Sequence, residues 1–253
     1  MAAPLPEQIQ TAVVTGGARG FGAAACRALH KAGYRVVITD VAPGAEAQAL
    51  ATELDLAGET AITATLDISK PGDFQEVLDK CVARWGSVEV LVNNAARTLA
   101  QPLMEIDPEV FNAIIATNVG GTFAGSQIFA RHFKARGYGR IVNMASLAGQ
   151  NGGTATGAHY AASKGAILTL TKVFARDLAP FGITCNAIAP GPMDTPMVRD
   201  VVGAQFEAVR KSIPVGQFGD PDFVAQMVVM LASPAAAFVT GACWDVNGGL
   251  YVR

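Results

Sequence analysis

The stretch HYAASKG, residues 159–165, places a phenol and an ammonium four residues apart. On a helix, Tyr160 and Lys164 would lie on the same face. A tyrosine is a poor base at neutral pH, because its pKa is about 10. An ammonium about 4 Å away stabilises the phenolate by about 4 kcal/mol at an effective dielectric constant near 20, before desolvation losses, or up to about three pKa units. The pair could therefore move a proton to and from a substrate oxygen. It could also be a chance pair on a surface helix.

The stretch TGGARGFG, residues 15–22, has the glycine spacing G-x-x-x-G-x-G. Glycine lets a backbone turn tightly and approach a pyrophosphate, which then lies at the positive N-terminus of a helix. Many such turns bind nothing, but this one follows a β-branched run and opens an Ala-rich one, which is the context that dinucleotide binding requires. The cofactor contacts predicted here are Gly16, Arg19, Gly20, Phe21 and Gly22.

Asp40 ends the second β-branched run and is followed by Val41. A carboxylate there accepts hydrogen bonds from the adenosine ribose and repels a 2′-phosphate, which favours NAD over NADP. Arg19 argues the other way, because its guanidinium could pair with that phosphate. We interpret Arg19 as a solvated loop charge and assign Asp40 and Val41 to the cofactor site, although Asp40 could be a turn or cap residue.

Two further runs also end in polar residues. Asp67 and Ile68 could bind the adenine amino group and pack on its ring, or Asp67 could cap a helix that begins near Pro71. NNAA, residues 93–96, suits a backbone crowded against a ligand, with Asn93 tying adjacent strands together, or it is an ordinary Asx turn. The cofactor contacts predicted in these two stretches are Asp67, Ile68, Asn94, Ala95 and Ala96.

The elements that must position these residues are short β-branched runs separated by Ala-rich segments of helical spacing. The runs are residues 11–16, 35–40, 61–67, 88–94, 140–146, 183–190 and 242–249. Continuous apolar strands alternating with helices indicate a parallel sheet covered on both faces, with right-handed crossovers. In such sheets ligands bind beyond the carboxyl ends of the strands, where the glycines, carboxylates and amides fall.

The composition limits the function classes. The chain has 253 residues, 51% of them hydrophobic and 16% charged, which fits one domain with a large core. A net charge of −2 predicts no nucleic-acid or anionic-membrane partner. Apolar stretches end well short of the ~18 residues of a membrane span, and MAAPLPEQIQ lacks signal-peptide regions. Four distant cysteines form no metal-ligand cluster, so we expect no metal and a cytoplasmic protein with reduced thiols.

Taken in order, the motifs resemble the short-chain dehydrogenase/reductase family over nearly the whole chain. They are TGGARGFG, Asp40, Asp67, NNAA, Asn118, IVNMAS, YAASK and PGPMDT. The resemblance extends to NAD-dependent alcohol dehydrogenases and 3-oxoacyl-acyl-carrier-protein reductases. It implies an α/β fold, a single Rossmann-fold domain over residues 1–253. Its doubly wound, seven-stranded parallel sheet would carry helices on both faces, with a substrate lid at about residues 190–214.

The resemblance also implies a catalytic set of Asn118, Ser146, Tyr160 and Lys164. Tyr160 would be the general base and acid for hydride transfer between NAD(H) and a secondary alcohol or ketone. Lys164 would also hold the nicotinamide ribose, and Ser146 would bind the substrate oxygen. Asn118, in a long helix from about residue 108 to 136, would hold a water linking Lys164 to solvent. Taken alone, Ser146 could be a turn residue, Asn118 a polar kink and Lys164 a solvated charge.

The chain departs from the family pattern at three places. Ala96 stands where glycine is usual, and the spacing between Ser146 and Tyr160 is one residue longer than usual. Arg97 follows Ala96 where an aliphatic residue is common, so it places a cation either near the substrate or on the rim.

After the sixth run, PGPMDTPM would carry the chain past the nicotinamide. Pro190 and Gly191 would turn it, and Thr195 would bind the carboxamide or the pyrophosphate. Met193, Met197 and Phe206 would give the lid an apolar inner surface, unless the methionines merely pack on the core. Met193 is also placed among the cofactor contacts. His159 is interpreted as structural or pocket-lining, not catalytic. The predicted substrate contacts are Arg97, Ser146, Leu147, Gln150, His159 and Met193.

The helix from Pro108 is apolar on more than one side, which predicts burial against both the sheet and a partner subunit, as in a homotetramer. The apolar ending GGLYVR fits a buried C-terminus. Two rival functions stay open beside the dehydrogenase. A 3-oxoacyl-acyl-carrier-protein reductase usually uses NADPH, and Asp40 argues against it. A non-catalytic dinucleotide sensor would have a broken catalytic set, and here all four residues are present.

Overall fold

The computed structural model describes residues 9–153, 156–195, 203 and 206–252. In this part of the chain seven strands form one parallel sheet in the order β3-β2-β1-β4-β5-β6-β7. The strands are β1 (Thr11–Thr15), β2 (Arg35–Asp40), β3 (Ala61–Thr65), β4 (Val90–Asn93), β5 (Gly139–Met144), β6 (Ile183–Pro190) and β7 (Cys243–Val246). Each of the seven predicted runs contains one of these strands, apart from a one-residue extension of β5, so the predicted sheet is confirmed.

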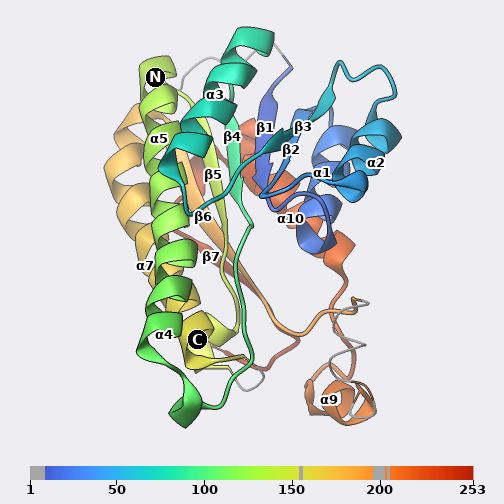
Figure 1. The fold of residues 1–253 in the computed structure, drawn as a ribbon, viewed down its shortest axis with the longest axis vertical. Helices are drawn as coiled ribbons and strands as arrows, with labels where there is room; N and C mark the ends of the chain where they lie inside the picture. The colour runs from blue at the N-terminus through green and yellow to red at the C-terminus, as the bar shows by residue number, and fades with distance from the viewer. Residues whose placement is uncertain (1–8, 154–155, 196–202, 204–205, 253) are drawn as a thin grey trace.

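Helices cover both faces of the sheet (Figure 1). One face carries α3 (Pro71–Trp85), α5 (Gly121–Arg136) and α7 (Ala158–Leu178). The other carries α1 (Gly20–Lys31), α2 (Ala45–Leu54) and α10 (Pro221–Ala232). Shorter helices lie toward the carboxyl ends of the strands, namely α4 (Pro108–Ile115), α6 (Ala148–Asn151) and α9 (Phe206–Ser212). This is the doubly wound α/β arrangement of a Rossmann fold.

The core has two halves because side chains of a strand alternate between the faces of the sheet. In β1, Val14 packs with the cluster of α1, α2 and α10, whereas Val13 packs with that of α3, α5 and α7. Both valines are fully buried, which is worth about 1.5–3 kcal/mol for a side chain of this kind. Burial on both faces explains why the central strands read as continuous apolar runs.

A buried polar network crosses the sheet next to the strand ends. Asn93 donates from Nδ2 to Asn143 Oδ1 at 2.8 Å and to Ser126 Oγ at 3.0 Å. Asn143 in turn donates to Thr171 Oγ1 at 2.9 Å. The predicted role of Asn93 in joining adjacent strands is confirmed, and the network also fixes α5 and α7 to β4 and β5.

The long helix predicted over residues 108–136 is present as α4 and α5, joined by a π-helical turn over Ala116–Gly120. Asn118 lies in that turn and is 1% exposed. A π turn inserts an extra residue into a helix and is frequent at functional sites. The helix is therefore interrupted at the predicted polar residue.

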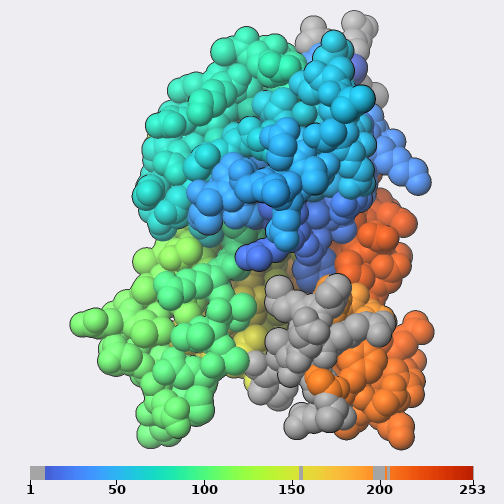
Figure 2. All heavy atoms as spheres, turned by 45° about the vertical axis from the view of Figure 1, so that its right-hand side comes forward, coloured from blue at the N-terminus to red at the C-terminus, as the bar shows by residue number. Residues whose placement is uncertain are grey.

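The carboxyl ends of the strands point toward α4, α6 and α9 (Figure 1). The strand order reverses between β1 and β4, which places the glycine turn after β1 beside the NNAA stretch after β4. In Figure 2 the green residues around α4 lie at the lower left and the orange residues of the α9 region at the lower right, below the blue and teal residues of the other half of the molecule. Of the predicted lid, Met197 lies outside the described residues. No described helix has the length and apolar character that a membrane span requires.

Candidate active site

The turn after β1 is built for a close approach of backbone and ligand. Gly16 and Gly20 have φ values of 61° and 55°, in the left-handed region that favours glycine. A Cβ on Gly22 would overlap the Gly16 carbonyl, whereas one on Gly20 would have open space around it. Arg19 caps α1 without a side-chain hydrogen bond, and the first turn holds no acid. The N–H groups of this helix end therefore suit a pyrophosphate.

Asn94 and Thr15 brace that turn from the neighbouring strand end. Asn94 donates from Nδ2 to the carbonyls of Thr15 and Gly16, at 2.9 Å and 3.0 Å. Thr15 Oγ1 accepts from the N–H groups of Asn94 and Ala95, at 2.9 Å and 3.0 Å. The side-chain amide of Asn94 is thus used within the protein. Its predicted part in the cofactor site is therefore to position the glycine turn. Thr15 was missed because a threonine that ends a strand gives no signal of its own.

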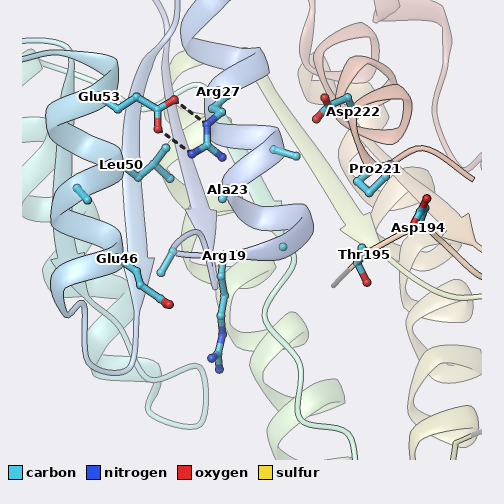
Figure 3. Close-up of a pocket in the computed structure, with 14 residues that line it drawn as sticks. Arg19, Ala23, Arg27, Glu46, Leu50, Glu53, Asp194, Thr195, Pro221 and Asp222 are labelled. Carbon is cyan, nitrogen blue, oxygen red and sulfur yellow. Dashed lines mark hydrogen bonds and ion pairs between the residues drawn. The ribbon is translucent and has the colours of Figure 1, made fainter. Parts of the chain in front are cut away.

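Asp40 and Arg19 are the two residues on which the cofactor preference was argued. Asp40 ends β2, is partly buried and accepts from Val41 N–H at 2.9 Å through Oδ1, as a turn residue does. Its Oδ2 has no hydrogen-bond partner in the described part of the chain and can accept from a ribose hydroxyl. Arg19 is exposed and extends away from the ion pair between Arg27 and Glu53 (Figure 3).

Asp67 and Ile68, which are predicted cofactor contacts, also have partners within the protein. The Asp67 carboxylate accepts from Ser69 N–H at 3.0 Å and Ser69 Oγ at 2.7 Å, which closes an Asx turn. These bonds, with Lys70 Nζ at 3.7 Å, hold the pKa of Asp67 below its usual value. The N-cap of α3 is Lys70, so Asp67 is not the cap. Ile68 is 7% exposed and packs in the core beside Gly121, which leaves little of its surface for an adenine ring.

A cavity of about 460 Å³ lies between α1, α2 and α10 (Figure 3). It borders the glycine turn at Arg19 and Gly20, and the ion pair of Arg27 with Glu53 lies in its wall. Thr195 lines it, and its main-chain N–H donates to Met193 O at 3.0 Å. None of the four predicted catalytic residues lines this cavity, which borders the glycine turn and not Tyr160.

The predicted catalytic residues converge at the end of β5 and the start of α7. Tyr160 and Lys164 lie on the first turns of α7, and Lys164 Nζ is 5.6 Å from the centroid of the Tyr160 ring. Lys164 is 3% exposed and donates to the Met144 carbonyl at 2.6 Å. Ser146, just beyond β5, lies near enough to the Tyr160 side chain to act on its pKa. The structure thus brings Ser146, Tyr160 and Lys164 together.

Burial dominates the protonation of both groups. Burial lowers the pKa of Lys164 to about 8. It raises the pKa of Tyr160, and the nearby Ser146 side chain partly opposes that rise. The expected lowering of the tyrosine pKa by the ammonium is therefore not found in the protein alone. Lys164 directs a hydrogen bond to a main-chain carbonyl, and the loss of water around the phenol outweighs its attraction.

Asn118 connects the active-site helix to the loop that follows NNAA. Its Oδ1 accepts from Arg97 N–H at 2.7 Å, and its Nδ2 donates to Arg97 O at 2.9 Å and Ser163 Oγ at 3.0 Å. Ser163 Oγ donates onward to Tyr160 O at 2.7 Å. Both amide hydrogens are used within the protein, and the water that Asn118 would hold beside Lys164 stays a prediction. Ser163 was missed, because its place inside YAASK is its only signal.

Three predicted substrate contacts hydrogen-bond within the protein. Leu147 N–H donates to Pro190 O at 2.9 Å, and Gln150 Nε2 donates to Asp245 Oδ1 at 2.6 Å on the edge strand β7. His159 is fully buried, and its Nδ1 accepts from Tyr160 N–H at 2.8 Å, which agrees with a structural role. Arg97 is exposed.

The start of the predicted lid packs on the core. Met193 is 2% exposed and lies in the same cluster as Val14, so the prediction of an apolar lid surface is wrong for this side chain. Gly191 N–H donates to Val246 O at 2.8 Å, which fixes the turn after Pro190. The Phe206 ring stacks on Phe218, with centroids 4.4 Å apart. Ala96 is exposed, and the Phe21 side chain packs against the core.

Comparison with known proteins gives consistent relatives over the whole chain. A family model described as enoyl-(acyl carrier protein) reductase matches residues 16–251. A 4-formylbenzenesulfonate dehydrogenase of Comamonas testosteroni is 39% identical over 95% of this chain and 97% of its own. A cis-4-hydroxycyclohexanecarboxylate dehydrogenase of Sinomonas cyclohexanicum is 37% identical over 95% and 96%. A 3-oxoacyl-(acyl-carrier-protein) reductase of Vibrio cholerae is 35% identical over 96% and 98%.

The doubly wound sheet, the glycine turn and the partly buried tyrosine beside a buried lysine define a dinucleotide-dependent oxidoreductase. The relatives agree with that class. The chain belongs to the short-chain dehydrogenase/reductase family and is an oxidoreductase that transfers a hydride between a nicotinamide cofactor and a CH–OH or carbonyl group.

Proposed function

We propose that this chain transfers a hydride between NAD(H) and a secondary alcohol or ketone, with Tyr160 as general acid and base. The observation that carries the proposal is the group of Ser146, Tyr160 and Lys164 between the end of β5 and the start of α7, in which Lys164 is buried and the other two are partly buried. When bound, the nicotinamide ring accepts the hydride in oxidation and donates it in reduction. The turn of Gly16, Gly20 and Gly22 would hold the pyrophosphate, because a helix N-terminus without a cap faces open space there.

The residues of the site divide the proton chemistry among them. Ser146 binds the substrate oxygen and orients it toward Tyr160. In oxidation the Tyr160 phenolate takes the hydroxyl proton, and in reduction the phenol returns a proton to the carbonyl oxygen. The Lys164 ammonium stabilises the phenolate, and the Met144 carbonyl keeps that ammonium in place. Asn118 holds the helix turn that carries Tyr160 through Ser163.

The preference for NAD rests on Asp40, whose carboxylate repels a 2′-phosphate and has one oxygen free for the ribose. A specific observation favours the rival, a 3-oxoacyl-(acyl-carrier-protein) reductase. A protein of that name is 35% identical to this chain, and Arg19 has no partner in the described part. Under the rival, Arg19 pairs with the phosphate of NADPH. The kinetic preference between the two cofactors separates the proposals.

The test is nicotinamide absorbance with a panel of secondary alcohols and ketones, run with NAD(H) and NADP(H) side by side. We expect turnover that favours NAD(H). In Tyr160→Phe we expect kcat/KM to fall by about 10³ with cofactor affinity unchanged, because general acid–base catalysis contributes about 10²–10⁴. A clear NADP(H) preference would favour the rival, and tight cofactor binding with no turnover of any substrate would favour a sensing role.

We further propose a homotetramer that works in the cytoplasm, with residues 190–214 closing over the substrate. Phe123 of α5 is 44% exposed and contacts the Phe174 ring of α7, and Val173 is 39% exposed on the same layer, which supports a partner on this face. Cys26, Cys81 and Cys185 are buried thiols, which suits a reducing compartment. Light scattering at micromolar concentration should give about four times the 26.1 kDa chain mass, and a monomer would contradict this.

A further inference from the structure

Arg97 has a guanidinium without a partner at the rim of the active site. Most arginines in the described part of the chain have partners, such as Arg27 with Glu53 and Arg140 with main-chain carbonyls. Arg97 makes no side-chain hydrogen bond or ion pair with the described residues, and the same holds for Arg19, Arg136 and Arg35, whose guanidinium lies over the Trp85 ring. Arg136 lies in the last turn of α5, where the helix carbonyls favour a cation. Arg19 and Arg97 lie on loops beyond strand ends.

The main chain of Arg97 is fixed relative to Tyr160. Asn118 binds both the N–H and the C=O of Arg97, and through Ser163 it is linked to the Tyr160 carbonyl. Two residues later, the Leu99 carbonyl accepts from the N–H of Gly157 at 3.3 Å, and Gly157 is the N-cap of α7. Residues 97–99 therefore lie against the first turn of the helix that carries Tyr160.

This arrangement suits the capture of an anion. A guanidinium binds a carboxylate or sulfonate through two parallel hydrogen bonds. Because the backbone at Arg97 is already held by two hydrogen bonds, binding must order only the side chain, which lowers its entropic cost. Asp107, on the loop after Arg97, has its carboxylate engaged as the cap of α4 and does not compete for the guanidinium.

We propose that Arg97 binds an anionic group of the substrate and so determines specificity. The preferred substrate is then an alcohol or ketone that also carries a carboxylate or sulfonate away from the reacting carbon. This inference rests on the proposed activity at Tyr160, since it assigns the other end of the same substrate.

The test uses probe pairs that share a shape and differ in charge. They are 4-oxocyclohexanecarboxylate with its carboxamide, and 4-acetylbenzenesulfonate with its sulfonamide. Calorimetry measures the binding of each probe to the enzyme saturated with oxidised cofactor, which has no hydride to transfer, and absorbance with reduced cofactor measures its reduction. We expect each acid to bind about tenfold more tightly than its amide, the least that a hydrogen bond to a charged group provides.

In Arg97→Met the ratio of acid to amide affinity should fall to about 1, with amide affinity unchanged. Arg97→Lys should keep part of the ratio, because it retains the charge and loses the planar fork. Arg136→Met is the matched control and should keep the wild-type ratio.

Three results would overturn the proposal. They are equal affinity for acid and amide, no measurable binding of either acid, and a preference that survives Arg97→Met. A preference without turnover would support Arg97 and count against the proposed activity. Turnover of both members of a pair without a preference would support the proposed activity and count against the role of Arg97.

Discussion

Burial shifts the pKa values of two neighbouring groups of the site, the ammonium of Lys164 and the phenol of Tyr160. The Lys164 ammonium is almost fully removed from water and has a main-chain carbonyl as hydrogen-bond partner, and its pKa falls to about 8. The neighbouring phenol of Tyr160 moves the opposite way, because burial disfavours its anion. Both groups are thus held closer to their neutral forms than in water, which favours the protonated phenol that reduction uses as its general acid.

The lowered pKa of Lys164 predicts how the free energy of unfolding depends on pH. Between pH 8 and the ordinary lysine value of 10.5 the unfolded chain binds more protons at this residue than the folded chain, so its contribution to the free energy of unfolding rises with pH. From pH 8 to about 9.5 the wild type should gain about 2 kcal/mol relative to Lys164→Met in urea titrations. The same change at the exposed Lys172 of α7 should give a curve parallel to wild type. Parallel curves for Lys164→Met would contradict the assignment.

Among individual residues, the sequence predicted the catalytic side chains better than it predicted which atoms each side chain contacts. Ser146, Tyr160 and Lys164 come together as predicted, because two lie on one helix face and the third ends the strand beside them. Met193 was misplaced, since an apolar residue in a loop looks the same whether it faces a pocket or the core. The link from Asn118 to Arg97 was not predictable, because it joins a side chain to main-chain atoms.

Helix α1 is the element that most constrains the cofactor site. Gly22 lies in its first turn, where an added methyl group would overlap the Gly16 carbonyl. In Gly22→Ala we expect cofactor affinity to fall at least about tenfold and stability to fall by about 1–3 kcal/mol, because the turn must widen. Fluorescence titration with NADH and urea unfolding measure the two effects.

Gly72→Ala is the control for that change. Gly72 lies in the first turn of α3, with open space around an added Cβ and no positive φ. This variant should gain about 0.4–1 kcal/mol by restricting the unfolded chain, with cofactor affinity unchanged. Wild-type cofactor affinity in Gly22→Ala would show that the turn yields and would remove the argument for a fixed glycine there.

The elements themselves were largely predictable, for a physical reason. A strand buried on both faces must be apolar at every position, so each strand reads as one run bounded by polar ends. The π turn at Ala116–Gly120 could not be predicted, because its residues have ordinary helical spacing. It follows from how Asn118 meets the loop at Arg97 and Ser163 of α7.

Across the sheet, the catalytic residues lie at the carboxyl ends of the strands, and a buried arginine that stabilises the fold lies at the amino ends. At the amino end Arg140 is 2% exposed and donates to the carbonyls of Gly139, Gly182 and Ser233, at 2.8, 3.2 and 3.2 Å. Its guanidinium lies 4.3 Å from the centroid of the Tyr138 ring, and burial lowers its pKa. This side chain joins the start of β5 to the turns before β6 and after α10.

Removing that guanidinium should destabilise the whole fold. In Arg140→Met we expect the free energy of unfolding to fall by about 3 kcal/mol or more, because buried carbonyls lose a charged donor. The kcat of the folded fraction should not change, since the site lies at the other end of the sheet. Arg136→Met, at an exposed position, should change stability by about 0.5 kcal/mol or less. Equal effects of the two variants in urea unfolding would contradict the role given to Arg140.

The contact between Asn118 and Arg97 has a consequence for divergence within the family. Asn118 binds atoms that every residue type except proline possesses, namely one N–H and one C=O. Position 97 can therefore accept almost any side chain without disturbing Ser163 or Tyr160. A duplicated gene could acquire a new substrate by a single codon change there while its proton chemistry stayed intact.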